Sequence, residues 1–318
     1  MVKNPSRVKN KVKRTSLYTK YKSEKKAAKK SLKKERIQEA EALGQELPKK
    51  TPRTIENTRL EDENRILPND TEVLGDEQDD EFAEYYSGAK VSFAFTMVDG
   101  SLTMSLKKPK IMITTRPKCS RKLFTLIADL MQMVPNAFYY PRETKTVQDM
   151  IADAESKKFT HLIVLSERMK ECDGLLIAHL PKGPTAFLRL SSFEPGSKIP
   201  GHGRPTSHIP ELILNNFNTR LGRRIGRLLG SLFPHEPQFE GRQVVTFHNQ
   251  RDFIFVRHHR YIYREENSKT RARLQELGPR FTLKPRWLQE GLFDTQFGEY
   301  EWIYKRRTMD VNRRKFNL

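Results

Sequence analysis

Residues 111–165 read IMITTRPKCSRKLFTLIADLMQMVPNAFYYPRETKTVQDMIADAESKKFTHLIVL, and this stretch decides the fold. A β-rich run at 111–115 is followed, after Pro117 and Ser120, by apolar residues at helical spacing. Pro135 ends this helix, and the sequence then predicts a strand at 137–140, a helix at 146–156 and a buried strand at 160–166. Strands that alternate with helices in this way predict an α/β layer structure.

A looser form of the same alternation is predicted further along the chain. Two strands, at 174–180 and 185–190, flank the turn Pro-Lys-Gly-Pro. After a loop rich in glycine and proline, we expect a helix at 209–232. The other expected elements are strands at 243–248, 253–257, 261–264 and 300–304 and a short helix at 285–290. The sequence therefore predicts two related α/β halves around a shared sheet.

Charge divides the 318 residues into zones, although the whole chain has a formal net charge of +20. Residues 1–50 have a net charge of +12 and almost no apolar stripe, which predicts a basic arm that is disordered or helical. This arm is either a nuclear-import and RNA-binding element or a solvated tail. Residues 51–106 are expected to form an acidic linker. This linker is a solvated spacer, a docking peptide, or a segment that binds the basic arm in competition with the arm's other partners. Residues 107–307 form the expected folded domain, and residues 308–318 a C-terminal tail.

Composition argues against several classes of protein. No apolar stretch approaches the ~20 residues that span a bilayer, so we expect no membrane partner. Cys119 and Cys172 lie far apart, which argues against a disulfide framework or a zinc site of paired cysteines. The chain lacks a P-loop motif and any evident catalytic triad or carboxylate pair. We therefore expect no catalytic residues, no metal and no cofactor.

The strong positive charge of the folded region instead indicates a polyanionic partner, of which nucleic acid is the commonest. The helix around 218–232 is the most informative element, because leucine, arginine and glycine form separate stripes on it. Each glycine costs about 1 kcal/mol against alanine inside a helix, so close approach of another backbone is expected there. At the glycines, the approaching backbone is either another part of the domain or RNA. For the arginines, we favour contact with RNA phosphates.

Two other basic clusters are candidate RNA contacts. One lies at the strand-to-helix turn after residue 115, where a helix N-terminus favours anions. The other alternates with aromatic residues along the strands after residue 241; there we favour core packing for the aromatics and RNA for the cations. The complete set of candidate RNA-binding residues is Arg116, Lys118, Arg121, Lys122, Arg220, Arg223, Arg224, Arg227, Arg242, Arg251, Arg257, His258, His259, Arg260, Arg264, Arg280 and Lys284.

Four motifs, in order along the chain, resemble those of the Brix-domain family. HLPKGPT at 179–185 resembles its strand–turn–strand motif, and NNFN at 215–218 with the following helix resembles its central helix. VVTFHNQRDFIFVRHHRY at 244–261 and GPRFTLK at 278–284 are similar to its paired strands and its late segment. The likeness covers residues 110–305, and Trp287 departs from it.

This resemblance implies a two-half α/β fold similar to the anticodon-binding domains of some tRNA synthetases. It also implies a non-enzymatic ribosome-assembly factor in the nucleolus or nucleus, and the branch it most resembles acts on the large (60S) subunit. The implied partners are precursor large-subunit rRNA, the pre-60S particle and a dedicated protein assembly factor. The alternatives are a small-subunit assembly factor of the same family and an RNA-processing enzyme.

Overall fold

The computed structural model describes residues 9–43, 52–54, 56–60, 64–66, 70–86, 97–98, 101–102, 108–266, 269–294, 296–309 and 314–318. The chain forms two compact units, residues 1–58 and residues 59–318. The first unit contains the helix α1 (Lys11–Leu43), which is exposed along almost all of its described length. For the basic arm, the structure therefore shows the helical alternative.

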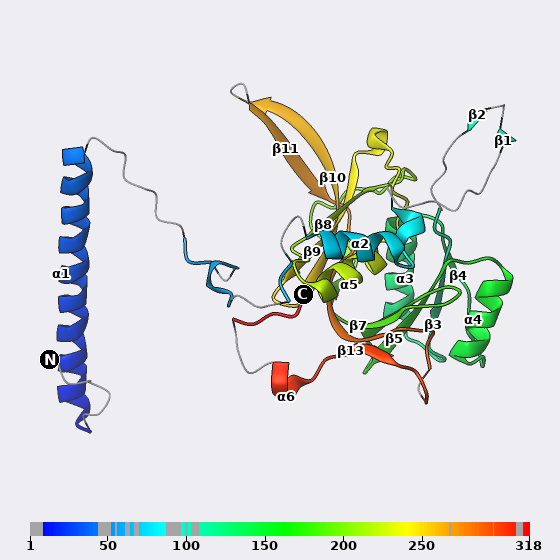
Figure 1. The fold of residues 1–318 in the computed structure, drawn as a ribbon, viewed down its shortest axis with the longest axis horizontal. Coiled ribbons are helices and arrows are strands. Elements are labelled where there is room, and N and C mark those ends of the chain that lie inside the picture. Colours follow the sequence, from blue (N-terminus) through cyan, green and yellow to red (C-terminus); the bar gives the residue numbers. More distant parts are fainter. Residues whose placement is uncertain are drawn as a thin grey trace. The chain divides into compact units, whose positions relative to one another are not determined.

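The second unit is built on one sheet of eleven strands (Figure 1). Its order is β4-β3-β5-β6-β7-β12-β10-β9-β8, with β11 paired to β10 and β13 to β12. The strands are β3 (Ile111–Thr115), β4 (Ala137–Tyr139), β5 (His161–Arg168), β6 (Glu171–His179), β7 (Thr185–Glu194), β8 (Glu211–Asn215), β9 (Gln243–Gln250), β10 (Phe253–Glu266), β11 (Lys269–Glu276), β12 (Arg280–Gln289) and β13 (Tyr300–Ile303). The strands β1 (Met97–Val98) and β2 (Ser101–Leu102) form a separate small sheet.

Helices pack on both faces of the large sheet. The helices of this unit are α2 (Thr71–Asp79), α3 (Arg121–Met133), α4 (Val147–Ser156), α5 (Arg220–Gly230) and α6 (Arg306–Met309). Side chains of β5 alternate between two cores: Ile163 and Leu165 join the core that includes α3 and α5, and Leu162 and Val164 join the core that includes α4. The expected α/β layer structure is therefore confirmed.

The two halves of the sheet follow related plans. In the first, β3 connects through α3 to the parallel strand β4, and β5, β6 and β7 then pair as an antiparallel meander. In the second, β8 connects through α5 to the parallel strand β9, and antiparallel strands follow. The halves join where β7 pairs with β12, which is consistent with two related halves around a shared sheet.

Local sequence explains where the helices begin. Thr146 and Asp149 form a reciprocal capping box at α4. The side chain of Thr219 accepts a hydrogen bond from the backbone of Gly222 at the start of α5. Both caps satisfy N–H groups that have no partner inside the helix.

Several expected elements were wrong. The helix expected at 209–232 is a strand, β8, followed by the shorter α5, because Leu212 and Leu214 pack against the core with the period of a strand. The helix expected at 285–290 is part of β12, whose register shifts after Pro285, so that the proline is tolerated. Trp287 stacks on Phe187 within this region.

Further along, β10 is one long strand rather than two, and β11 was missed because its mostly polar sequence has no apolar pattern. The expected C-terminal tail also contributes to the core, since Phe316 and Leu318 are buried. The expected acidic linker contains α2 and a short 3-10 turn, Ala83–Tyr85, that pack on the domain as described below.

Candidate nucleic-acid interface

The helix α5 presents the three faces that its sequence predicts. Ile225, Leu228 and Leu229 are buried in the main core, so the apolar face is confirmed. The basic side chains lie on another face, which we call the arginine face: Arg220, Arg223, Arg224 and Arg227.

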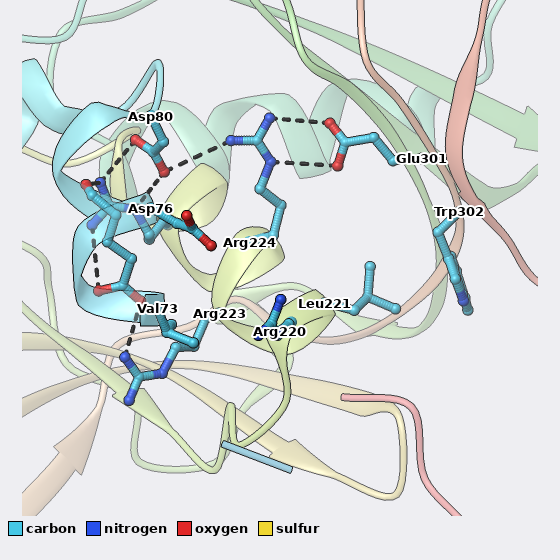
Figure 2. Close-up of a pocket in the computed structure, with 11 residues that line it drawn as sticks. Val73, Asp76, Asp80, Arg220, Leu221, Arg223, Arg224, Glu301 and Trp302 are labelled. Carbon is cyan, nitrogen blue, oxygen red and sulfur yellow. Dashed lines mark hydrogen bonds and ion pairs between the residues drawn. The ribbon is translucent and has the colours of Figure 1, made fainter. Parts of the chain in front are cut away.

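The arginine face is covered by an acidic segment of the same chain, residues 70–86 (Figure 2). This segment begins with Asp70, which caps α2, and continues through Asp80 and Glu81. The ion pairs, by nitrogen–oxygen distance, are Arg220–Glu72 at 3.1 Å, Arg223–Glu77 at 3.0 Å, Arg224–Glu81 at 2.6 Å, Arg224–Glu301 at 3.0 Å and Arg227–Asp80 at 2.7 Å.

The innermost pair is the most buried. The side chains of Arg227 and Asp80 are only 13% and 11% exposed, and two guanidinium nitrogens donate to the carboxylate at 2.7 and 2.8 Å. Burial disfavours the charge of Arg227, but its hydrogen bonds to Asp80 raise its pKa. Burial likewise opposes ionisation of Glu81, yet the hydrogen bond from Arg224 lowers its pKa. Hydrogen bonds from partners of opposite sign therefore favour the charged forms of Arg227 and Glu81.

Apolar residues anchor the acidic segment to the domain. Phe82 and Tyr85 are fully buried, and Phe82 belongs to the main core. The hydroxyl of Tyr86 donates to the backbone oxygen of Arg227 at 2.9 Å, and burial raises the pKa of this tyrosine. Such contacts make the acidic segment part of the folded domain rather than a solvated spacer.

This arrangement gives the arginine face partners within the chain, and the phosphate contact expected there stays a prediction. Carboxylates already contact Arg223, Arg224 and Arg227 in the geometry that phosphate oxygens would take. The sequence carried a signal for this, because residues 70–86 contain eight acidic residues and no lysine or arginine. Only tertiary contact shows that the two sets meet.

The glycine face packs against protein. A Cβ on Gly230 would lie 2.1 Å from the hydroxyl oxygen of Tyr86, and one on Gly222 would lie 3.1 Å from backbone of Leu318. A Cβ on Gly226 would contact the ring of Phe217 at 3.4 Å. Of the two alternatives for these glycines, packing within the domain is confirmed.

The basic turn before α3 is partly neutralised by Glu167. The carboxylate of Glu167 accepts from the backbone N–H of Ser120 at 3.0 Å and from its hydroxyl at 2.6 Å, and these hydrogen bonds lower its pKa. Arg116 donates to the backbone oxygen of Glu167, and Lys122 lies 3.8 Å from Glu171. The anion expected at this helix N-terminus is therefore supplied by the protein, while Lys118 and Arg121 are exposed to solvent.

The third cluster does not form one surface. His258 is 1% exposed, donates through Nδ1 to the backbone oxygen of Gly278, and has its pKa lowered to about 4 by burial. It lies on the side of β10 that also carries Ile254 and Val256, which are buried in the main core, so this side chain is not placed to contact RNA. His259 is half-buried, and burial lowers its pKa as well.

Several cations of this cluster have protein contacts. Arg280 forms a bidentate pair with Glu276, at 2.6 and 2.5 Å, and Arg257 lies 4.0 Å from the same carboxylate. Lys284 lies over the rings of Phe253 and Tyr304. Arg242 and Arg251 are exposed at turns with positive φ.

The remaining two predicted residues, Arg260 and Arg264, lie on the hairpin of β10 and β11. This hairpin adds Arg271 and Arg273, which the sequence reasoning missed because it predicted no strand there. Alternating arginines in Lys-Thr-Arg-Ala-Arg were the available signal, since alternation is typical of a strand with one charged face.

The described residues contain no cluster of histidine, cysteine, aspartate or glutamate that could hold a metal ion. In the same part of the chain, no helix combines the length and apolar character needed to cross a membrane. The geometry instead presents an α/β domain in which, among the described residues, exposed cations lie at turns and on one hairpin.

Sequence comparison identifies the class of this domain. The family model described as Brix domain matches residues 116–287, and the chain belongs to the Brix-domain family. Within it, the chain is most like the branch called ribosome production factor 1. It is 48% identical over 315 residues to that protein of Pongo abelii, covering 98% of this chain and 84% of the relative. It is 39% identical over 320 residues to that of Saccharomyces cerevisiae, covering 99% of both.

Among solved structures, the chain is similar to a probable ribosomal biogenesis protein from Aeropyrum pernix. The two share 11% identity with a TM-score of 0.39, over 62% of this chain and 99% of that one. An archaeal Imp4-like protein, Mil, shares 13% identity with a TM-score of 0.33, over 57% and 99%.

Proposed function

We propose that this chain is a non-enzymatic ribosome-assembly factor that binds precursor rRNA during maturation of the large (60S) subunit. The observation that carries the proposal is identity of 39–48% to ribosome production factor 1 proteins over almost the whole chain. The formal net charge of +17 on residues 106–318 supports RNA as the partner, because so much charge on a folded segment favours a polyanion.

The proposed place of action is the nucleolus, on the pre-60S particle, beside a dedicated protein assembly factor. The arm of residues 1–50, with its net charge of +12, supports nuclear location and a second RNA contact. The acidic segment packs on its own domain, so the partner is expected at the sheet edge. The outermost strand β4 exposes Phe138 there, and Phe124 of α3 is also exposed.

Two experiments in cells test the function. In the first, the tagged chain is crosslinked to RNA; in the second, the chain is depleted and the amount of each rRNA precursor is measured. We expect crosslinks in large-subunit rRNA and accumulation of its precursors. Crosslinks and accumulation confined to small-subunit precursors would favour the small-subunit alternative. Incubation of the pure chain with rRNA fragments and nucleotide or methyl-donor cofactors tests the enzyme alternative, and we expect no RNA product.

A further inference from the structure

The hairpin of β10 and β11 gathers its arginines on one face and its tyrosines on the other. Cross-strand pairs place Arg264 opposite Arg271, and Ile262 opposite Arg273. Because side chains alternate along a strand, these four residues share one face with Arg260 and Gln275. We call this surface the basic ribbon face. The opposite face carries Tyr261, Tyr263, Ala272 and Leu274.

The outer part of this hairpin leaves the sheet. The pairing of β10 with β9 ends at Arg260, and the backbone N–H of Tyr261 still donates to the backbone oxygen of Arg242 at 2.9 Å. From Ile262 onward β10 pairs only with β11 among the described residues. Figure 1 shows the two strands extending away from the body of the domain. A two-stranded ribbon without a further layer is marginally stable in water, so a bound partner would stabilise it.

The cations of the basic ribbon face differ from those of α5 in their exposure. Arg264, Arg271 and Arg273 are all exposed, whereas Arg227 of α5 is 13% exposed and fixed by a buried carboxylate. Ion pairs between exposed groups contribute little to stability, so a phosphate can replace any such partner of these arginines at little cost.

We propose that the basic ribbon face binds the phosphate backbone of double-stranded RNA, an inference that rests on the proposed function. Arginines two residues apart on a strand lie about 6.6–6.8 Å apart, and each guanidinium can donate two parallel hydrogen bonds to a phosphate. The face carries no aromatic ring on which unpaired bases could stack. Duplex RNA, in contrast, is recognised through its backbone and shape.

The test uses the full chain and a fluorescent RNA duplex of about 16 base pairs, which is the length that a double-stranded RNA-binding domain spans. The ribbon variant combines Arg264→Gln, Arg271→Gln and Arg273→Gln. The matched control combines Lys157→Gln, Lys170→Gln and Lys182→Gln, which are exposed and remove the same charge outside the ribbon. Affinity is measured by anisotropy at several salt concentrations, and thermal melting confirms that both variants fold.

We expect the ribbon variant to lose about tenfold or more in duplex affinity and its log–log salt slope to fall by about 2–3, one per lost phosphate contact. The control should change the duplex affinity and the salt slope less than the ribbon variant does. A variant that combines Arg264→Lys, Arg271→Lys and Arg273→Lys keeps the charge and should retain most of the binding. An equal loss in both variants, or a stronger loss for single-stranded RNA or for poly-glutamate than for the duplex, would overturn the ribbon site. If the ribbon variant binds the duplex with wild-type affinity, the ribbon site is overturned, but the proposed RNA-binding function is not. A wild-type chain that binds no RNA would instead refute the proposed function.

Discussion

Replacement of Arg227 by glutamine tests whether the arginine face of α5 stabilises the fold. In the folded chain Arg227 donates to both carboxylate oxygens of Asp80, at 2.7 and 2.8 Å, and to the backbone oxygen of Glu77 at 2.7 Å. The change leaves the carboxylate of Asp80, whose side chain is 11% exposed, without its principal cation.

The expected cost follows from this geometry. Removal of one partner from a fully buried ion pair costs about 3–5 kcal/mol. Here Arg224 stays within 3.7 Å of Asp80 and compensates in part, so the expected loss in free energy of unfolding is about 1–3 kcal/mol. Urea denaturation of the full chain, at constant pH and salt, measures it.

Two further variants make the measurement decisive. Arg220→Gln is the matched control on the same helix, because Arg220 and Glu72 are 58% and 69% exposed and such a pair contributes about 0–1 kcal/mol. Addition of Asp80→Asn to Arg227→Gln should recover about 1 kcal/mol or more, since it removes the unpaired charge. The reasoning is refuted if Arg227→Gln costs no more than Arg220→Gln and the double mutant is additive. A loss of RNA affinity at unchanged stability would restore phosphate contact as the role of Arg227.

Three other predictions test separate parts of the structure. Gly230→Ala should destabilise the domain, because its Cβ would lie 2.1 Å from the hydroxyl oxygen of Tyr86; Tyr86→Phe in the same chain should relieve part of the loss, and equal stability of wild type and Gly230→Ala would contradict the packing. Burial lowers the pKa of His258 to about 4, so the unfolded chain binds the proton first as pH falls. Stability should therefore decline by up to about 1.4 kcal/mol per pH unit between the unfolded pKa of about 6.5 and the folded pKa of about 4. A His258→Gln variant that folds should show a flatter decline between pH 7 and 5, and an identical decline would argue that other groups cause it. Deletion of residues 1–50 should leave the melting transition of the domain nearly unchanged, since α1 is exposed along almost all of its described length, and should weaken RNA binding; a large loss of stability would show that the arm supports the domain.

The apolar pattern by itself determined most of the first half of the domain. The strands β3 and β5 and the helices α3 and α4 lie close to their predicted positions. Both strands are short continuous apolar runs, and both helices carry apolar residues at helical spacing. Pro135 follows α3, and Thr146 caps the start of α4. The second half was harder to predict. The apolar run 212–214 of β8 is too short to show a period, so it fits a helix as well as a strand when no partner strand is known, and β11 has almost no apolar residues to form a pattern.

The sequence also determined that arginines gather on one face of α5, since that depends only on the spacing of residues along a helix. Which anion they meet was decided by the tertiary structure. Asp80 precedes Arg227 by 147 residues, and they meet because Phe82 and Tyr85, close to Asp80 in sequence, are buried in the domain that contains α5. Likewise, the arginines of β10 and β11 form one surface only when the strands pair in register. Local spacing sets which side chains share a face of one element, but the choice between a carboxylate and a phosphate partner depends on contacts between segments distant in sequence.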